Sequence, residues 1–143
     1  MRILGLDIGT KTIGIAVSDE LSLTAQGLLT LKRKGLQSDI RELEKLIEER
    51  SIERIVIGLP KNMNNTLGTS AKMVLSFIEE LTKSVDLPVV TWDERLSTVA
   101  AEKALLEADM SRKKRKRVID TVAAQLILQG YLDSQQRLKN PSL

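Results

Sequence analysis

The sequence predicts a single α/β domain with a five-stranded mixed sheet in the order 3-2-1-4-5 and helices on both faces. Three apolar runs follow one another near the amino terminus, and helical and strand-like patterns alternate after them. Sequential antiparallel strands followed by such alternation imply a mixed sheet covered on both sides. Right-handed crossovers place the fourth strand beside the first and the fifth beyond it. A length of 143 residues fits one core, so residues 1–143 are treated as one domain.

The first strands form an antiparallel meander. Strands are predicted at residues 2–8 and 12–18, because both segments are apolar and the tight turn Gly9-Thr10-Lys11 separates them. A third apolar run at residues 28–31 follows at a short distance along the chain. Short connections of this kind join neighbouring antiparallel strands, which places the second strand between the first and the third.

Helices and strands alternate from residue 36 onward. Leu36, Ile40, Leu43 and Ile47 recur with the spacing of one face of an amphipathic helix. The β-branched run at residues 54–58 predicts a buried parallel strand. Residues 70–82 repeat the helical spacing and predict a second helix, which serves as the crossover to the next strand.

The last third of the chain completes the pattern. Residues 88–92 predict the fifth strand, and Ser97 or Thr98 can cap a third helix that runs to about residue 107. A last helix is predicted over residues 118–132, and the polar residues 133–143 are expected to form a frayed tail. This order of elements is typical of an RNase H-like domain.

Composition excludes several kinds of chemistry. The chain has no cysteine and no histidine. Disulfides, cysteine-ligated zinc and thiol catalysis are therefore excluded, and so are Ser-His-Asp triads and acid–base catalysis by histidine. The amino terminus lacks a long apolar segment, and no window of 18 residues is uninterruptedly apolar. These observations predict a cytoplasmic protein without a membrane span.

Three acidic residues stand out by their positions. Asp7 interrupts an apolar strand, Glu94 directly follows the fifth strand, and Asp120 lies at the start of the last helix. A buried carboxylate is costly unless a cation, a metal or hydrogen-bond donors accompany it. Carboxylates brought together can hold two divalent cations that activate water and stabilise the leaving oxygen in phosphodiester hydrolysis. The sequence thus indicates a site for two Mg²⁺ or Mn²⁺ ions, which prefer oxygen ligands.

Each acid also has an ordinary explanation when it is considered alone. An acid near a strand end is often a turn residue, and Glu94 can favour the dipole of the third helix or pair with Arg95. Asp120 can form an i, i+4 pair with Lys116. Glu94 raises a further difficulty, since the fifth strand lies roughly 10 Å from the first and the side chain must reach inward. Ala123 and Ala124, in contrast, are small enough to let the last helix approach the sheet.

Six adjacent basic residues precede the last helix and are expected in the loop that enters it: Arg112, Lys113, Lys114, Arg115, Lys116 and Arg117. A solvated segment is one interpretation, and a surface that displaces counterions from a nucleic-acid backbone is the other. The second is favoured because a candidate metal ligand follows closely. Aromatic residues make up 2% of the chain, so backbone recognition is favoured over base stacking. A second basic run occupies residues 32–34.

Four segments together resemble the YqgF/RuvX family: LDIGTKTIGIAVSD at 6–19, VIGLPKNM at 56–63, DERLST at 93–98 and VIDTVAAQLILQGYLD at 118–133. The resemblance implies an RNase H-like fold related to the Holliday junction resolvase RuvC. Members are regarded as nucleases that process the 5′ end of the precursor of 16S ribosomal RNA, and resolvase-like activity on branched DNA has also been suggested. Membership implies that Asp7, Glu94 and Asp120 are catalytic metal ligands. The chain departs from its relatives at Asn64-Asn65, where an Asp-Gly pair is common.

The expected partners follow from this interpretation. They are precursor ribosomal RNA, branched DNA and ribosomal precursor particles, and no membrane is expected. Thr10, Lys11, Asn62 and Arg95 are expected to assist the basic run in holding the nucleic-acid backbone. A resolvase would need two sites and hence a homodimer, whereas a monomer suffices for other cleavage.

Two other functions remain open from the residues. The pattern Asp-x-Gly-Thr-Lys at 7–11 is similar to the first phosphate loop of actin-like ATPases and sugar kinases. Those proteins need two RNase H-like lobes and a second acidic glycine motif, whereas this chain has the length of one lobe. An RNase H-like module that binds nucleic acid without catalysis is the second alternative, and the presence of all three carboxylates argues against it.

Overall fold

A computed structural model of the chain describes residues 1–60, 68–94 and 112–139, and for 112–120 it describes the helical backbone alone. Its sheet has the predicted order β3-β2-β1-β4-β5. The strands are β1 (Arg2–Ile8), β2 (Thr12–Ser18), β3 (Ala25–Lys32), β4 (Ile52–Leu59) and β5 (Val89–Asp93). β2 is antiparallel to both of its neighbours, β1 and β3, and β4 and β5 continue the sheet in parallel with β1. The predicted α/β fold with a mixed sheet is confirmed.

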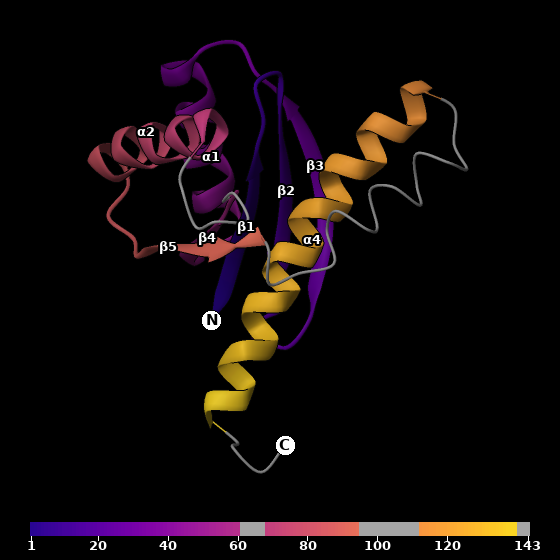
Figure 1. Cartoon of the computed structure of the whole chain (residues 1–143). Helices are drawn as coiled ribbons and strands as arrows, with labels where there is room; N and C mark the ends of the chain where they lie inside the picture. Colours follow the sequence, from indigo (N-terminus) through magenta and orange to yellow (C-terminus); the bar gives the residue numbers. More distant parts are fainter. Residues whose placement is uncertain (61–67, 95–111, 140–143) are drawn as a thin grey trace.

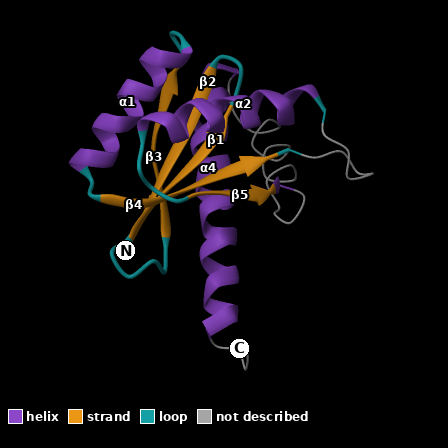
Figure 2. Ribbon diagram, turned by 90° about the vertical axis from the view of Figure 1, so that its left-hand side faces the viewer, coloured by secondary structure: helices purple, strands orange, loops and turns teal. Residues whose placement is uncertain are grey.

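Helices cover both faces of the sheet (Figure 1; Figure 2). The helices α1 (Leu36–Glu49) and α2 (Thr69–Ser84) pack on one face, and α4 (Arg112–Lys139) crosses the other. Alternation along β1 supplies both layers, since Leu4 and Leu6 belong to the core under α1 and α2 while Ile3 belongs to the core under α4. The inner strands are therefore apolar on both sides, as the sequence predicted for the parallel part of the sheet.

Small residues let α4 approach the sheet closely. Ala123 and Ala124 are fully buried. A Cβ atom added to Gly5 of β1 would lie 2.7 Å from Cβ of Leu128 and 3.2 Å from the carbonyl oxygen of Ala124. The close approach expected from the two alanines is therefore confirmed, and Gly5 contributes to it from the opposite side.

Two expectations about α4 were wrong. Residues 112–117, expected in a loop, form the first turns of the helix, because Lys and Arg are good helix formers and nothing in the run interrupts the helix. Residues 133–139, expected to fray, continue the helix to Lys139. Ser134 donates a hydrogen bond to the carbonyl of Tyr131, and the basic residues in the last turn suit the helix dipole.

The edge strand β3 is longer than its apolar run predicted. It begins at Ala25, where the backbone N–H donates to Oε1 of Gln129 and the carbonyl accepts from Nε2 of Gln125, both on α4. Because these contacts come from a distant segment, the short apolar run alone could not indicate the strand start. The predicted third helix, at 97–107, lies outside the described residues. Within the described ranges, no helix has both the length and the apolar character needed to cross a bilayer.

Candidate active site

Asp7 lies on the α4 side of the sheet, near the carboxyl end of β1. It is half-buried, and it faces Gly14 of β2 in the antiparallel register. The turn that follows is tight, since the N–H of Gly9 donates to the carbonyl oxygen of Thr12 at 2.8 Å. A Cβ atom on Gly9 would lie 2.9 Å from that same oxygen, so the turn requires glycine. Thr10 and Lys11 are consequently presented to solvent directly after the acid.

Glu94 reaches from the end of β5 across the neighbouring strand. Its Oε1 atom lies 2.8 Å from the position that a Cβ atom of Gly58 would occupy. Gly58 is in β4, which lies between β5 and β1, and it comes one residue after the Leu6–Ile57 pair. The carboxylate of Glu94 therefore lies over the strand adjacent to Asp7. The reach of Glu94 thus covers one of the two strand spacings between β5 and β1 that the sequence left as a difficulty.

Gly58 shapes the candidate site, and the sequence did not single it out. A side chain at this position would collide with Glu94 and with Cδ1 of Ile127, which would lie 2.4 Å away. The available signal was a glycine inside a β-branched strand, which often marks close approach of another group.

The backbone of Asp120 lies in α4, at the level of Asp7 in the sheet. Thr121, the next residue, forms a 2.8 Å hydrogen bond between its Oγ1 and Oγ1 of Thr30. Thr30 pairs with Gly14, and Gly14 pairs with Asp7, so these three positions form one row across the sheet. Ala124, which packs on Gly5, follows Asp120 by one helical turn of about 5.4 Å. The carboxylate of Asp120 itself lies outside the described atoms.

The donor set fits a hard divalent cation. Asp7 and Glu94 supply carboxylate oxygens at the same end and on the same face of the sheet, and Gly58 leaves the space that Glu94 occupies. Among the side chains that the structure describes, no group of three or more acidic residues could hold a metal ion. The predicted third ligand, Asp120, is outside that set.

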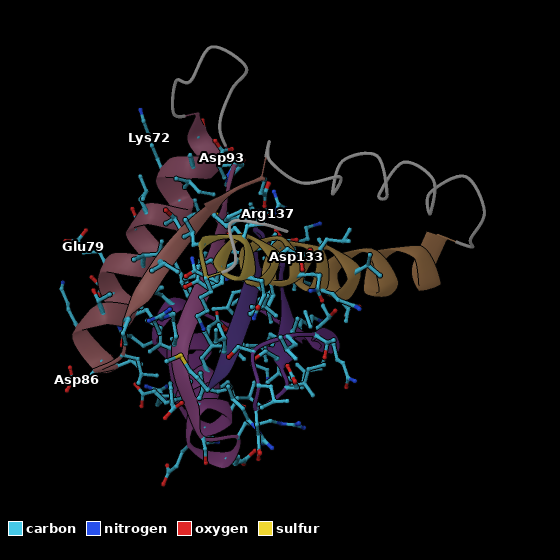
Figure 3. All side chains as sticks on the ribbon, turned by 90° about the horizontal axis from the view of Figure 1, so that it is seen from below. Lys72, Glu79, Asp86, Asp93, Asp133 and Arg137 are labelled. Atoms are coloured by element: carbon cyan, nitrogen blue, oxygen red, sulfur yellow. The ribbon has the colours of Figure 1, made fainter. Side chains whose placement is uncertain are left out.

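The predicted nucleic-acid contacts are described to different extents. Thr10 and Lys11 are exposed beside Asp7, and the residues from Arg112 to Arg117 have their backbone in the first turns of α4. Asn62 and Arg95 lie outside the described residues. Figure 3 shows Asp93, the residue before Glu94, at the end of β5 and Lys72 projecting from the first turns of α2.

Comparisons with known proteins find relatives along nearly the whole chain. A family model described as "RuvX: Holliday junction resolvase" matches residues 1–134. A protein from Desulforamulus reducens is 59% identical over 134 residues, which cover 94% of this chain and 98% of the relative. A protein from Clostridioides difficile is 59% identical over 132 residues, covering 92% of this chain and 94% of the relative. Both relatives carry the name "Putative pre-16S rRNA nuclease".

Solved structures share the fold at much lower sequence identity. RuvC from T. thermophilus, solved with a Holliday junction substrate, matches with a TM-score of 0.59 and 14% identity, covering 94% of this chain and 96% of the other. The fowlpox virus Holliday junction resolvase matches with a TM-score of 0.55 and 17% identity, covering 94% and 99%. These similarities establish the RNase H-like fold.

Proposed function

The chain belongs to the RuvX family of Holliday junction resolvases, and from this premise we propose that it is a metal-dependent nuclease that processes the 5′ end of precursor 16S ribosomal RNA. It is a hydrolase that acts on ester bonds, as its nuclease relatives and its resolvase-like fold indicate. The observation that carries the proposal is the convergence of Glu94 over Gly58 toward the strand that bears Asp7.

In the proposed site, Asp7 is the central ligand for Mg²⁺ or Mn²⁺, and Glu94 and Asp120 complete the set. A bound pair of such ions supplies an activated water and stabilises the leaving oxygen. Gly58 keeps the carboxylate of Glu94 directed inward. Thr10 and Lys11 present donors and positive charge to a phosphate next to Asp7, because a tight turn with exposed N–H groups favours anions.

The basic turns of α4 hold the nucleic-acid backbone in this proposal. Arg112 to Arg117 neutralise phosphates without reading bases, and Asn62 and Arg95 assist them. Such contacts suit structured RNA within ribosomal precursor particles in the cytoplasm. They also suit branched DNA, and the family description favours junction resolution as the second candidate. Resolution needs two sites and hence a homodimer, whereas processing of RNA is compatible with a monomer.

Substitution Asp7→Asn tests the proposal. It removes a negative charge from a metal ligand while keeping its shape. Mutation of a residue that hydrogen-bonds to a metal ligand typically lowers metal affinity or activity about 10–100-fold. Loss of a direct ligand should therefore lower them at least as much. We expect cleavage of a precursor 16S RNA fragment to fall by about 100-fold or more, and binding of Mn²⁺ in isothermal titration to weaken with it.

The matched control is Asp86→Asn, which makes the same change at an exposed acid after α2 (Figure 3). Its cleavage and Mn²⁺ binding should equal those of the wild type, and both variants should remain folded. Cleavage by Asp7→Asn at the wild-type rate would refute the mechanism. Absence of metal binding and of cleavage in the wild type would favour a module that binds nucleic acid without catalysis.

A further inference from the structure

A group of exposed lysines lies at the same end of the sheet as the candidate active site. Lys11 is in the turn after β1, Lys32 ends β3, and Lys34 follows it. None of these three lysines takes part in an ion pair with another residue in the described parts of the chain. We propose that this lysine patch (Lys11, Lys32 and Lys34) binds the backbone of a nucleic-acid arm that extends away from the site. The inference rests on the proposed function and adds a second substrate-binding surface to it.

The strand register places Lys32 on the face of the sheet that carries Asp7. Lys32 pairs with Thr12, and Thr30 pairs with Gly14, which faces Asp7. Lys32 therefore lies on the same face as the row that contains Asp7, two residues, or about 7 Å, further toward the end of the sheet. A phosphodiester chain that crosses the Asp7 row can continue over Lys32 without a change of face.

A buried ion pair organises the patch from beneath. The side chain of Arg33 turns inward, where Nε donates to Oδ2 of Asp39 at 3.0 Å and Nη1 donates to the carbonyl of Gly9 at 2.9 Å. The guanidinium also lies over the ring of Phe77, 5.4 Å from its centroid. Asp39 is 1% exposed, so its negative charge is used by Arg33 and is not available at the surface to neutralise the lysines.

Hydrogen bonds of the backbone next to the ion pair fix both sides of the patch. The N–H of Arg33 donates to the carbonyl of Lys11 at 2.9 Å, and the N–H of Lys34 donates to Oδ1 of Asp39 at 3.0 Å. The side chain of Arg33, the middle residue of the basic run at 32–34, is thus turned inward and half-buried, while Lys32 and Lys34 are exposed. Three cations on an anchored backbone bind a polyanion at a smaller entropic cost than cations on a mobile segment.

The basic turns of α4 extend past the edge strand β3. Thr121 contacts Thr30, and residues 112–117 precede Thr121 by four to nine positions, or about 6 to 13.5 Å along the helix axis. Figure 1 shows these turns projecting past the sheet. Two basic segments therefore lie at one end of the molecule, and their extent suits a substrate with several phosphates outside the scissile bond.

The double substitution Lys32→Gln/Lys34→Gln tests the patch. It is made in the full-length Asp7→Asn chain, so that binding is measured without cleavage. Fluorescence anisotropy follows binding of a labelled RNA hairpin with a single-stranded 5′ arm and of a four-way DNA junction over a range of salt concentrations. Each lost phosphate contact lowers the slope of log affinity against log salt by about 0.9 on duplex and about 0.7 on single strands. We expect the double variant to lower the slope by about 1.4 to 1.8 and to weaken binding of both substrates.

The matched control is Lys83→Gln/Lys139→Gln in the same background. Both lysines are exposed and lie in the last turns of α2 and α4, away from the candidate site. Their substitution removes the same total charge as the test variant does. The control should change the slope of log affinity against log salt by less than the loss of one phosphate contact would, about 0.7 to 0.9. Equal slopes for the two double variants would overturn the patch.

Cleavage by chains that retain Asp7 separates the two proposals. Wild-type cleavage together with equal slopes would overturn the lysine patch alone. A specific change of slope without any wild-type cleavage would overturn the proposed nuclease mechanism and support the patch as a binding surface.

Discussion

Gly58 decides where the side chain of Glu94 can lie. The strand β4 separates Glu94 from β1, and any side chain at position 58 would fill the space above β4 that Oε1 of Glu94 occupies. The same absent side chain admits Ile127 of α4. One glycine therefore serves both the packing of the helix and the placement of a candidate ligand.

Substitution Gly58→Ala tests whether Gly58 affects metal binding through Glu94 in addition to its effect on stability. Overpacking of this kind typically costs about 1–3 kcal/mol of unfolding free energy, measured by urea denaturation. Displacement of Glu94 should in addition weaken Mn²⁺ binding by about 10–100-fold, measured by isothermal titration. Gly130→Ala is the control, because its new methyl group meets the ring of Trp92 at 3.1 to 3.3 Å and no acidic side chain. Equal metal affinities in the two variants would contradict the assigned role of Gly58.

Single residues differ in how well the sequence indicates them. Asp7 is conspicuous because an acid interrupts an apolar strand, and this signal is entirely local. The position of Glu94 depends on Gly58, which is 36 residues earlier in the chain and one strand away in the sheet. The apolar pattern of a strand cannot show which distant side chain will lie over one of its glycines. The position of Glu94 over Gly58 could therefore be found only from the structure.

The helix α4 combines an apolar stripe with a polar one. Ala123, Ala124, Ile127 and Leu128 are fully buried against the sheet. Thr121, Gln125 and Gln129, spaced four residues apart, contact β3 and the residues just before it through Thr30, Ala25 and Leu23. The polar contacts define the position of α4 along the edge strand, and thereby the level at which the backbone of Asp120 lies.

Substitution Ala124→Leu should displace α4 from β1. Ala124 is fully buried against the sheet, so a larger side chain has no space and should cost about 1–3 kcal/mol in urea denaturation. Since Asp120 is one turn away on the same helix, cleavage of RNA should fall more steeply than stability. Arg137→Leu, at an exposed position of α4, should lower stability by less than about 1 kcal/mol, the value of its interaction with the helix dipole, and leave cleavage unchanged. Unchanged cleavage in Ala124→Leu would show that the site does not depend on the seating of α4.

Helix ends were predicted less well than helix existence. The apolar stripe of α4 indicates residues 118–132, but the helix continues at both ends through segments rich in Arg, Lys and Gln. Those residues favour helix without producing an apolar period, so a pattern based on burial cannot register them. The start of β3 at Ala25 was missed for a related reason, since its stabilising contacts come from Gln125 and Gln129.

The complete fold was easier to predict than its details. Short connections require β1, β2 and β3 to be neighbours, and right-handed crossovers leave one side of β1 for β4. These rules depend on connection lengths and handedness, which the order of elements reveals. The pair of Arg33 and Asp39 could not be foreseen, because it joins the end of β3 to α1 and to the turn after β1.

Substitution Asp39→Asn should destabilise the complete fold. It leaves the guanidinium of Arg33, whose side chain is 16% exposed, without its counter-ion. Breaking one partner of a buried pair typically costs about 3–5 kcal/mol, which urea denaturation would measure. The apolar pair Arg33→Met/Asp39→Leu should recover much of this loss. A loss below 1 kcal/mol for Asp39→Asn would show that water already solvates the pair.

The seating of α4 also determines when the protein can become compact during its synthesis. Gln129 contacts Ala25 across 104 positions, and Leu128 covers Gly5. A nascent chain that has released only the first 110 residues has an uncovered apolar sheet face, because the helix that covers it is still inside or near the ribosomal tunnel. Premature termination before α4 would thus yield a fragment prone to aggregation and proteolysis, and this face of the sheet can be covered only after α4 has left the ribosome.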